Sequence, residues 1–222
     1  MSITGVHEQD AAGGGASILD LAALSATPLE RDPFDFLVVP SFVASESLAA
    51  INRDYPDIAE PGNFKLEDLD YGPAFAALMA ELSGPGLTDQ MGAKFGVDLS
   101  GCPQTITVRR FSEQTDGHIH VDHRTKIITM LVYLNEDWDT AGGQLRFLRS
   151  ATDLEDYAAE VAPLGGTMLA FRRSEKSFHG HKPFVGERRM IQLAWVREGP
   201  LARCEKHFNR LSKPVRRLLN MS

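Results

Sequence analysis

Cysteines, long apolar runs and early basic residues are scarce in this 222-residue sequence, and each scarcity argues against a class of protein. The two cysteines, Cys102 and Cys204, are too few for a disulfide framework or a thiolate zinc site. No run approaches the roughly 18 apolar residues that a membrane helix needs. No lysine or arginine precedes Arg31, and Asp20 interrupts the one apolar patch before it, so we expect no secretory signal. Our expectation is a cytoplasmic protein in a reducing setting, with no membrane contact.

Basic charge is also in short supply, and what there is lies unevenly along the chain. The net charge of −7 argues against general nucleic-acid binding, which normally needs a basic footprint. From Gly199 onward six basic residues stand against Glu205 alone, so this tail carries +5 and the rest of the chain −12. Apolar residues about one helical turn apart predict an amphipathic basic helix over 199–222. The oligomeric state cannot be inferred from these features.

The first hundred residues predict a loose arm followed by a strand and helices. Residues 1–27 contain a run of three glycines and little periodicity, so we expect a flexible arm. A single domain should follow over 28–198. It begins with a strand over 34–39 and a helix that opens at Ser45 or Glu46 and ends before Pro56. Two further helices are expected near 73–82 and 87–95.

From residue 105 the sequence changes to short β-rich runs separated by turn residues. Several short strands at this spacing predict a pair of sheets forming a sandwich or barrel, with a core over about 104–198. The fold class is therefore mainly β with flanking helices, an α+β arrangement. The expected strands are 105–111, 126–134, 144–148, 167–171 and 189–196.

The most informative residues are His120, Asp122 and His179. A His-x-Asp pair places two metal ligands at the end of one strand, and a distant imidazole can complete one face of an octahedron. This 2-His-1-carboxylate triad is typical of non-haem Fe(II) sites that keep open positions for other ligands. An arginine about ten residues after His179 suggests that one of those ligands carries a carboxylate.

A longer ordered set of motifs resembles the prolyl-hydroxylase-like branch of the 2-oxoglutarate/Fe(II)-dependent dioxygenases. The resemblance covers roughly 105–196, and its specificity comes from the order and spacing of the whole set. The residues that carry it are His120-Val121-Asp122, the run from Thr129 to Trp138, Gly142-Gly143, His179 with Pro183, and Arg189 with Trp195.

That resemblance implies a double-stranded β-helix (jelly roll) core in which His120, Asp122 and His179 ligate Fe(II). It also implies 2-oxoglutarate as cosubstrate together with O₂, with ascorbate as a candidate addition. The implied reaction hydroxylates an unactivated C–H bond of a prolyl, peptidyl or small-molecule substrate and releases succinate and CO₂. Substrate selection should depend mainly on the loops over 111–116, 149–160 and 171–178.

The distal carboxylate of 2-oxoglutarate needs a basic partner, and Arg188 and Arg189 both fit, since family members place this residue nine or ten positions after the last ligand. Arg189 shares its strand face with Ile191, Leu193 and Trp195, an otherwise apolar face that we expect to point inward, so we favour Arg189. Tyr133 lies where the family often has a tyrosine that supports the same carboxylate, and a plain strand aromatic is the less favoured alternative. Thr129 shares its face and is expected to line the pocket.

Two other interpretations remain. The run from His118 to His123 also fits H-x-H-x-D-H, the pattern of metallo-β-lactamase-like hydrolases with paired zinc ions. That fold needs a helix after its motif, where this sequence has a β run, and it leaves Arg189 unexplained. A non-catalytic jelly-roll binding protein is the other alternative. His118 could face the site or the surface, and His181 is assigned no role. Lys126 could reach a substrate, although a solvated lysine at the strand edge is the plainer interpretation.

Overall fold

The computed structural model describes residues 17–197. The basic helix predicted over 199–222 and the first part of the predicted arm, 1–16, lie outside these residues. The helices are α1 (Leu21–Ala26), α2 (Ser45–Arg53), α3 (Pro73–Leu82) and α4 (Pro85–Phe95), with a 3₁₀ turn η1 (Leu66–Asp68). The strands are β1 (Phe36–Val39), β2 (Phe64–Lys65), β3 (Gln104–Ser112), β4 (Lys126–Tyr133), β5 (Leu145–Leu148), β6 (Tyr157–Val161), β7 (Met168–Arg172), β8 (His179–Gly180) and β9 (Gly186–Val196).

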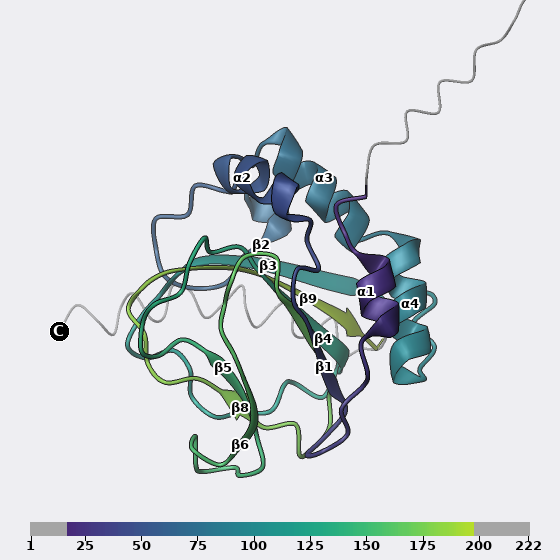
Figure 1. Cartoon of the computed structure of the whole chain (residues 1–222), viewed down its shortest axis with the longest axis vertical. Helices are drawn as coiled ribbons and strands as arrows, with labels where there is room; N and C mark the ends of the chain where they lie inside the picture. The colour runs from purple at the N-terminus through teal and green to yellow at the C-terminus, as the bar shows by residue number, and fades with distance from the viewer. Residues whose placement is uncertain (1–16, 198–222) are drawn as a thin grey trace, which may run out of the picture.

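Two antiparallel sheets face each other, and the helices cover one of them. The larger sheet has the order β1-β7-β4-β9-β3-β2, and the smaller one has the order β6-β5-β8. Figure 1 shows the helices on the outer face of the large sheet and the small sheet on its other side. This is the jelly-roll core with flanking helices that the sequence predicts, and the fold class is confirmed.

Because each face of the large sheet is covered, each face has its own core. Ile191, Leu193 and Trp195 point toward the helices and belong to the larger apolar cluster. Met190, on the opposite face of β9, belongs to the cluster between the two sheets. The apolar face of β9 therefore packs beneath the helices, and the other face lines the space between the sheets.

The helix boundaries follow from local chemistry. Helices α3 and α4 both begin with a proline, whose missing N–H costs nothing in the first turn of a helix. For α4 this places the start at Pro85, two residues before the predicted position. The helix ends at Gly96, which adopts the left-handed conformation that closes many helices. Within the described residues, no helix is both long and apolar enough to span a bilayer.

The boundary predicted for the flexible arm is wrong for residues 17–27. Helix α1 (Leu21–Ala26) lies in this stretch, and Leu19 and Leu24 are buried in the helix-side core. The Asp20 side chain accepts a hydrogen bond from the Ala23 amide and caps the helix, so the residue that interrupts the apolar patch starts the helix.

The loop predicted over 149–160 is also corrected at its end, because it runs into the edge strand β6. This strand contains Ala158, Ala159 and Glu160, which have low strand propensity, so the sequence shows no strand pattern. Pairing with β5 and an ion pair of 2.5 Å between Arg146 and Glu160 hold it in place.

Candidate active site

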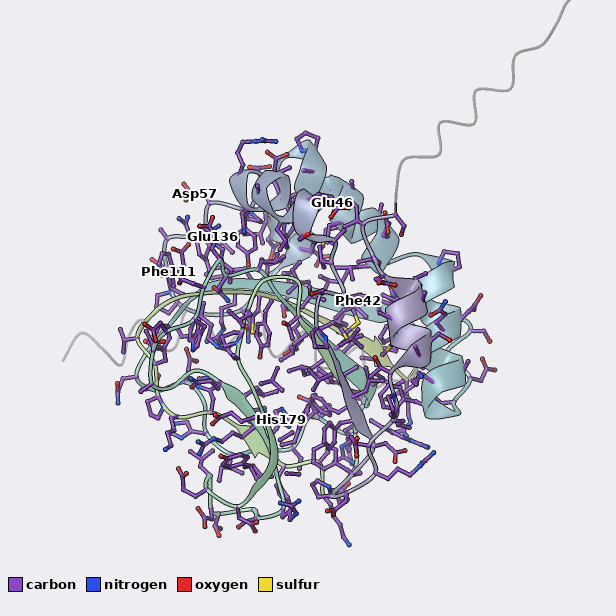
Figure 2. The ribbon with its side chains drawn as sticks, viewed as in Figure 1. Phe42, Glu46, Asp57, Phe111, Glu136 and His179 are labelled. Atoms are coloured by element: carbon purple, nitrogen blue, oxygen red, sulfur yellow. The ribbon has the colours of Figure 1, made fainter. Side chains whose placement is uncertain are left out.

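The three predicted metal ligands converge between the sheets. Their ligand atoms all lie within 4.8 Å of one another, and within residues 17–197 they form the one His/Cys/Asp/Glu group suited to hold a metal. His120 and His179 are neighbours because their backbones exchange two hydrogen bonds of 3.0 Å. Figure 2 shows His179, which begins β8, the strand of the small sheet next to β5.

Hydrogen bonds fix how both imidazoles present their nitrogens. His120 Nδ1 donates to the His118 carbonyl at 2.8 Å, and His179 Nδ1 donates to the Ser177 carbonyl at 3.0 Å. A carbonyl can only accept, so each ring carries its proton on Nδ1 and leaves Nε2 as the free ligand atom. Burial lowers the pKa of His179 to about 4, an effect that Asp122 partly opposes, so this ring is neutral at physiological pH.

Asp122 is buried and held from three sides. Its Oδ1 accepts from Lys126 Nζ at 2.9 Å, its Oδ2 accepts from the Thr129 hydroxyl, and its main-chain carbonyl accepts from Arg173 Nε at 3.2 Å. Burial favours a raised pKa, but Lys126 and the facing His179 outweigh it, helped by Thr129, so the pKa of Asp122 lies below its usual value. The carboxylate is therefore ionised, as a metal ligand must be.

Arg188, and not Arg189, points into the space between the sheets. Its side chain is 2% exposed, and its Nη2 donates to the Tyr133 hydroxyl at 3.1 Å. Its Nε donates to the Gly143 carbonyl at 2.9 Å, and its Nη1 contacts the Met190 sulfur at 3.0 Å. No carboxylate among residues 17–197 pairs with Arg188. Burial lowers the pKa of this guanidinium, and Tyr133 and Asp116 oppose this effect only in part.

The prediction that Arg189 points inward is wrong. The apolar face that it shares is the face beneath the helices, and there its guanidinium pairs with Glu187 at 2.7 Å and with the Asn52 side chain at 3.1 Å. It also lies over the ring of Tyr55. The sequence argument failed because both faces of β9 are buried, so apolar character did not mark the face that lines the site.

The structure brings Tyr133 to Arg188, as expected for two residues that bind one carboxylate. The Tyr133 side chain is fully buried, and burial raises its pKa, so its hydroxyl is neutral. Thr129 lies four residues before Tyr133 on the same face of β4, and its hydroxyl donates a hydrogen bond to the Asp122 carboxylate. It therefore contacts Asp122, one of the three predicted metal ligands.

The remaining histidines do not extend the metal cluster. His118 is exposed and contributes its carbonyl to His120, whereas His123 is exposed and its ring bonds Thr125. His181 is buried, and its Nδ1 donates to the Lys182 carbonyl. Burial, with help from Arg188, lowers the pKa of His181 to about 4. The part of the chain described by the structure thus offers no second ligand group of the kind that a paired-zinc hydrolase would need.

The roles of two further contributors were not predicted from the sequence. Lys126, expected as a solvated strand-edge residue, has a side chain only 15% exposed and contacts Asp122. Its position four residues after the carboxylate, at the start of a strand, was the available signal. Gly143 holds Arg188 through its carbonyl, and a side chain there would meet the Trp138 ring at 2.6 Å, which explains the second glycine of the Gly142-Gly143 pair.

Comparison with known proteins identifies a family to which the second half of the chain is similar. Residues 106–197 match the family model of the 2OG-Fe(II) oxygenase superfamily, in which 2OG stands for 2-oxoglutarate. No curated protein matches the chain.

Three solved structures share the fold. A prolyl-4-hydroxylase from Pseudomonas putida is 17% identical, with 81% of this chain and 100% of that chain covered and a TM-score of 0.55. A 2OG-Fe(II) oxygenase family oxidoreductase from Burkholderia pseudomallei is 15% identical, with coverages of 80% and 90% and a TM-score of 0.53. A prolyl hydroxylase from Trichoplax adhaerens, in complex with a hypoxia inducible factor peptide fragment, is 17% identical, with coverages of 81% and 88% and a TM-score of 0.53.

Proposed function

We propose, on the premise that residues 106–197 match the family model of the 2OG-Fe(II) oxygenase superfamily, that His120, Asp122 and His179 hold the iron while Arg188 and Tyr133 hold 2-oxoglutarate. With these groups bound, the site supplies oxidative decarboxylation of 2-oxoglutarate to succinate and CO₂, coupled to hydroxylation of an unactivated C–H bond. The substrate belongs to the class of prolyl, peptidyl or small molecules.

The three ligands suit a ferrous ion in number, charge and orientation. Two neutral imidazoles with free Nε2 atoms and one ionised carboxylate leave a divalent ion with one net positive charge and room for further ligands. The hydrogen bonds to His118, Ser177 and Thr129 fix these side chains before a metal arrives, so little reorganisation is needed on binding.

The observation that carries the cosubstrate assignment is the unpaired charge of Arg188. A guanidinium that is almost fully buried costs several kcal/mol unless a counterion compensates it. Arg188 has only neutral partners among the described residues, namely a carbonyl, a thioether and a phenol. Its planar donors match a carboxylate in two-point contact, and the Tyr133 hydroxyl lies close enough to add a third hydrogen bond.

Arg188 also lies on the correct strand to serve the metal centre. Arg188 lies on β9 and Tyr133 lies on the neighbouring strand β4. Tyr133 belongs to the apolar cluster between the sheets. Phe171 of that cluster packs its ring against His179, with centroids 4.6 Å apart. An elongated diacid could bind Arg188 at one end and the metal at the other, with apolar side chains excluding water around it.

Anaerobic titration with Fe(II) and 2-oxoglutarate tests the proposal. The ternary complex of this chemistry gives a visible metal-to-ligand charge-transfer absorption, which should appear with one iron per chain. The Asp122→Ala variant should lose it, whereas Asp57→Ala, which removes an almost fully exposed aspartate, should keep it. A wild-type protein that gives no such band, or that holds two zinc ions and hydrolyses esters or lactams, would refute the proposal.

A further inference from the structure

We propose, resting on the function proposed above, that Lys126 and Arg173 bind a carboxylate of the substrate beside the iron. The substrate would then be a small organic acid, free amino acids included, hydroxylated a few bonds from that carboxylate.

Lys126 is a mostly buried cation whose one counterion is a metal ligand. Its Nζ lies 2.9 Å from Asp122 Oδ1, and its side chain is 15% exposed. No other carboxylate among residues 17–197 pairs with it. Because iron draws on the negative charge of the same carboxylate, metal binding leaves Lys126 with a weakened partner.

A count of charges at the loaded site leads to the same point. Fe²⁺, Lys126, Arg173 and Arg188 would bring five positive charges, and Asp122, Glu175 and the 2-oxoglutarate dianion would bring four negative ones. One positive charge is left over. The distal carboxylate of 2-oxoglutarate compensates the charge of Arg188, so the excess positive charge lies at Lys126. A buried excess charge favours an anion in the remaining ligand, the substrate.

Arg173 adds a second donor on the same side of the metal centre. It directly follows β7, in which Phe171 packs its ring on His179. Its Nε donates to the Asp122 carbonyl, and its Nη1 pairs with Glu175, a side chain that is 80% exposed. Because this ion pair is exposed to solvent, it compensates the charge of Arg173 only weakly. Arg173 can therefore still attract a second anion.

Thr129 makes such a role compatible with metal binding. Its hydroxyl donates to Asp122 Oδ2 from a buried position, so the carboxylate stays oriented when Lys126 turns toward another anion. Lys126 lies one hydrogen bond from a metal-ligating group. An anion that it holds therefore lies close to the C–H bond presented to the iron, which limits the substrate to a compact acid.

The test uses the anaerobic protein saturated with Fe(II) and 2-oxoglutarate, monitored by circular dichroism of the charge-transfer band. The probes are propionate and L-proline, each compared with its amide. Both acids should perturb the band saturably, while propionamide and prolinamide should not. The Lys126→Met variant should form the band and lose at least about tenfold in affinity for the acids. The control Lys65→Met removes an exposed lysine in β2 and should match the wild type.

Each other result counts against the inference. Equal effects of acid and amide, no effect of either, or unchanged affinity in Lys126→Met would overturn it. Bleaching of the band would show displacement of 2-oxoglutarate, and failure of Lys126→Met to form the band would show that Lys126 only assembles the metal centre. A wild-type protein without the band would instead refute the proposed function.

Discussion

Replacing Arg188 by alanine should weaken 2-oxoglutarate binding by about two orders of magnitude. Truncating one partner of a buried, hydrogen-bonded charge pair costs about 2–5 kcal/mol, and each 1.4 kcal/mol is tenfold in affinity. Because Tyr133 remains to donate one hydrogen bond, we expect the lower part of this range, about 3 kcal/mol or roughly a hundredfold. The buried position of the guanidinium, at 2% exposure, is why solvent cannot replace it.

The matched control is Arg189→Ala. That side chain lies beneath the helices, where it pairs with Glu187 and Asn52, so its loss should change 2-oxoglutarate affinity by less than about threefold, within what a partly exposed ion pair contributes. The assay is anaerobic titration of each iron-loaded variant with 2-oxoglutarate, followed by the charge-transfer absorption.

The two variants should also differ in stability without ligands. The free energy of unfolding of apo Arg188→Ala should stay near that of the wild type or rise, because the substitution removes a buried charge without a counterion. A larger loss of 2-oxoglutarate affinity in Arg189→Ala, or equal losses in both variants, would refute the assignment of the clamp to Arg188.

Three further outcomes are expected. The pKa of His179 is about 4 in the folded chain against an ordinary 6.5, so the unfolded state binds this proton first as the pH falls. The free energy of unfolding of the apoprotein should therefore drop by about 3 kcal/mol between pH 6.5 and 4. A smaller pH dependence of this free energy in His179→Asn would confirm that His179 is the source. Gly143→Ala should raise the 2-oxoglutarate requirement and lower the melting temperature, because its Cβ would meet Trp138 at 2.6 Å. The control Gly96→Ala is strained in φ but has open space around it, so it should lower the free energy of unfolding by only about 1–2 kcal/mol. Equal effects of the two variants in thermal melts and titrations would contradict this. Leu24→Ala should cost about 2–5 kcal/mol in denaturant unfolding, and a change below about 0.5 kcal/mol would show that α1 is not part of the core.

The metal triad could be predicted from the sequence because it depends on short-range spacing and one distant imidazole. His120 and Asp122 share a segment of three residues, and the family resemblance supplied His179 as the third candidate ligand. Strands such as β4 could be predicted from their composition, which is rich in Ile, Val and Thr. The structure adds the backbone pairing between His120 and His179 that brings the ligands together.

The orientation of the arginine pair could not be predicted, because it depends on which layer covers each face of β9. Periodicity shows which residues share a face, but Arg188 and Arg189 both lie on faces covered by other elements. Lys126 and α1 were missed for a related reason. Their burial comes from partners distant along the chain or around the site, such as α4 packing on α1, which local patterns do not reveal.

The most direct test of the account is a crystal structure of the protein soaked anaerobically with Fe(II) and 2-oxoglutarate. We expect one iron bound by His120 Nε2, His179 Nε2 and the Asp122 carboxylate, with the distal carboxylate of 2-oxoglutarate on Arg188 and Tyr133. Metal ions bound through His118 or His123, or a cosubstrate carboxylate on Arg189, would contradict it.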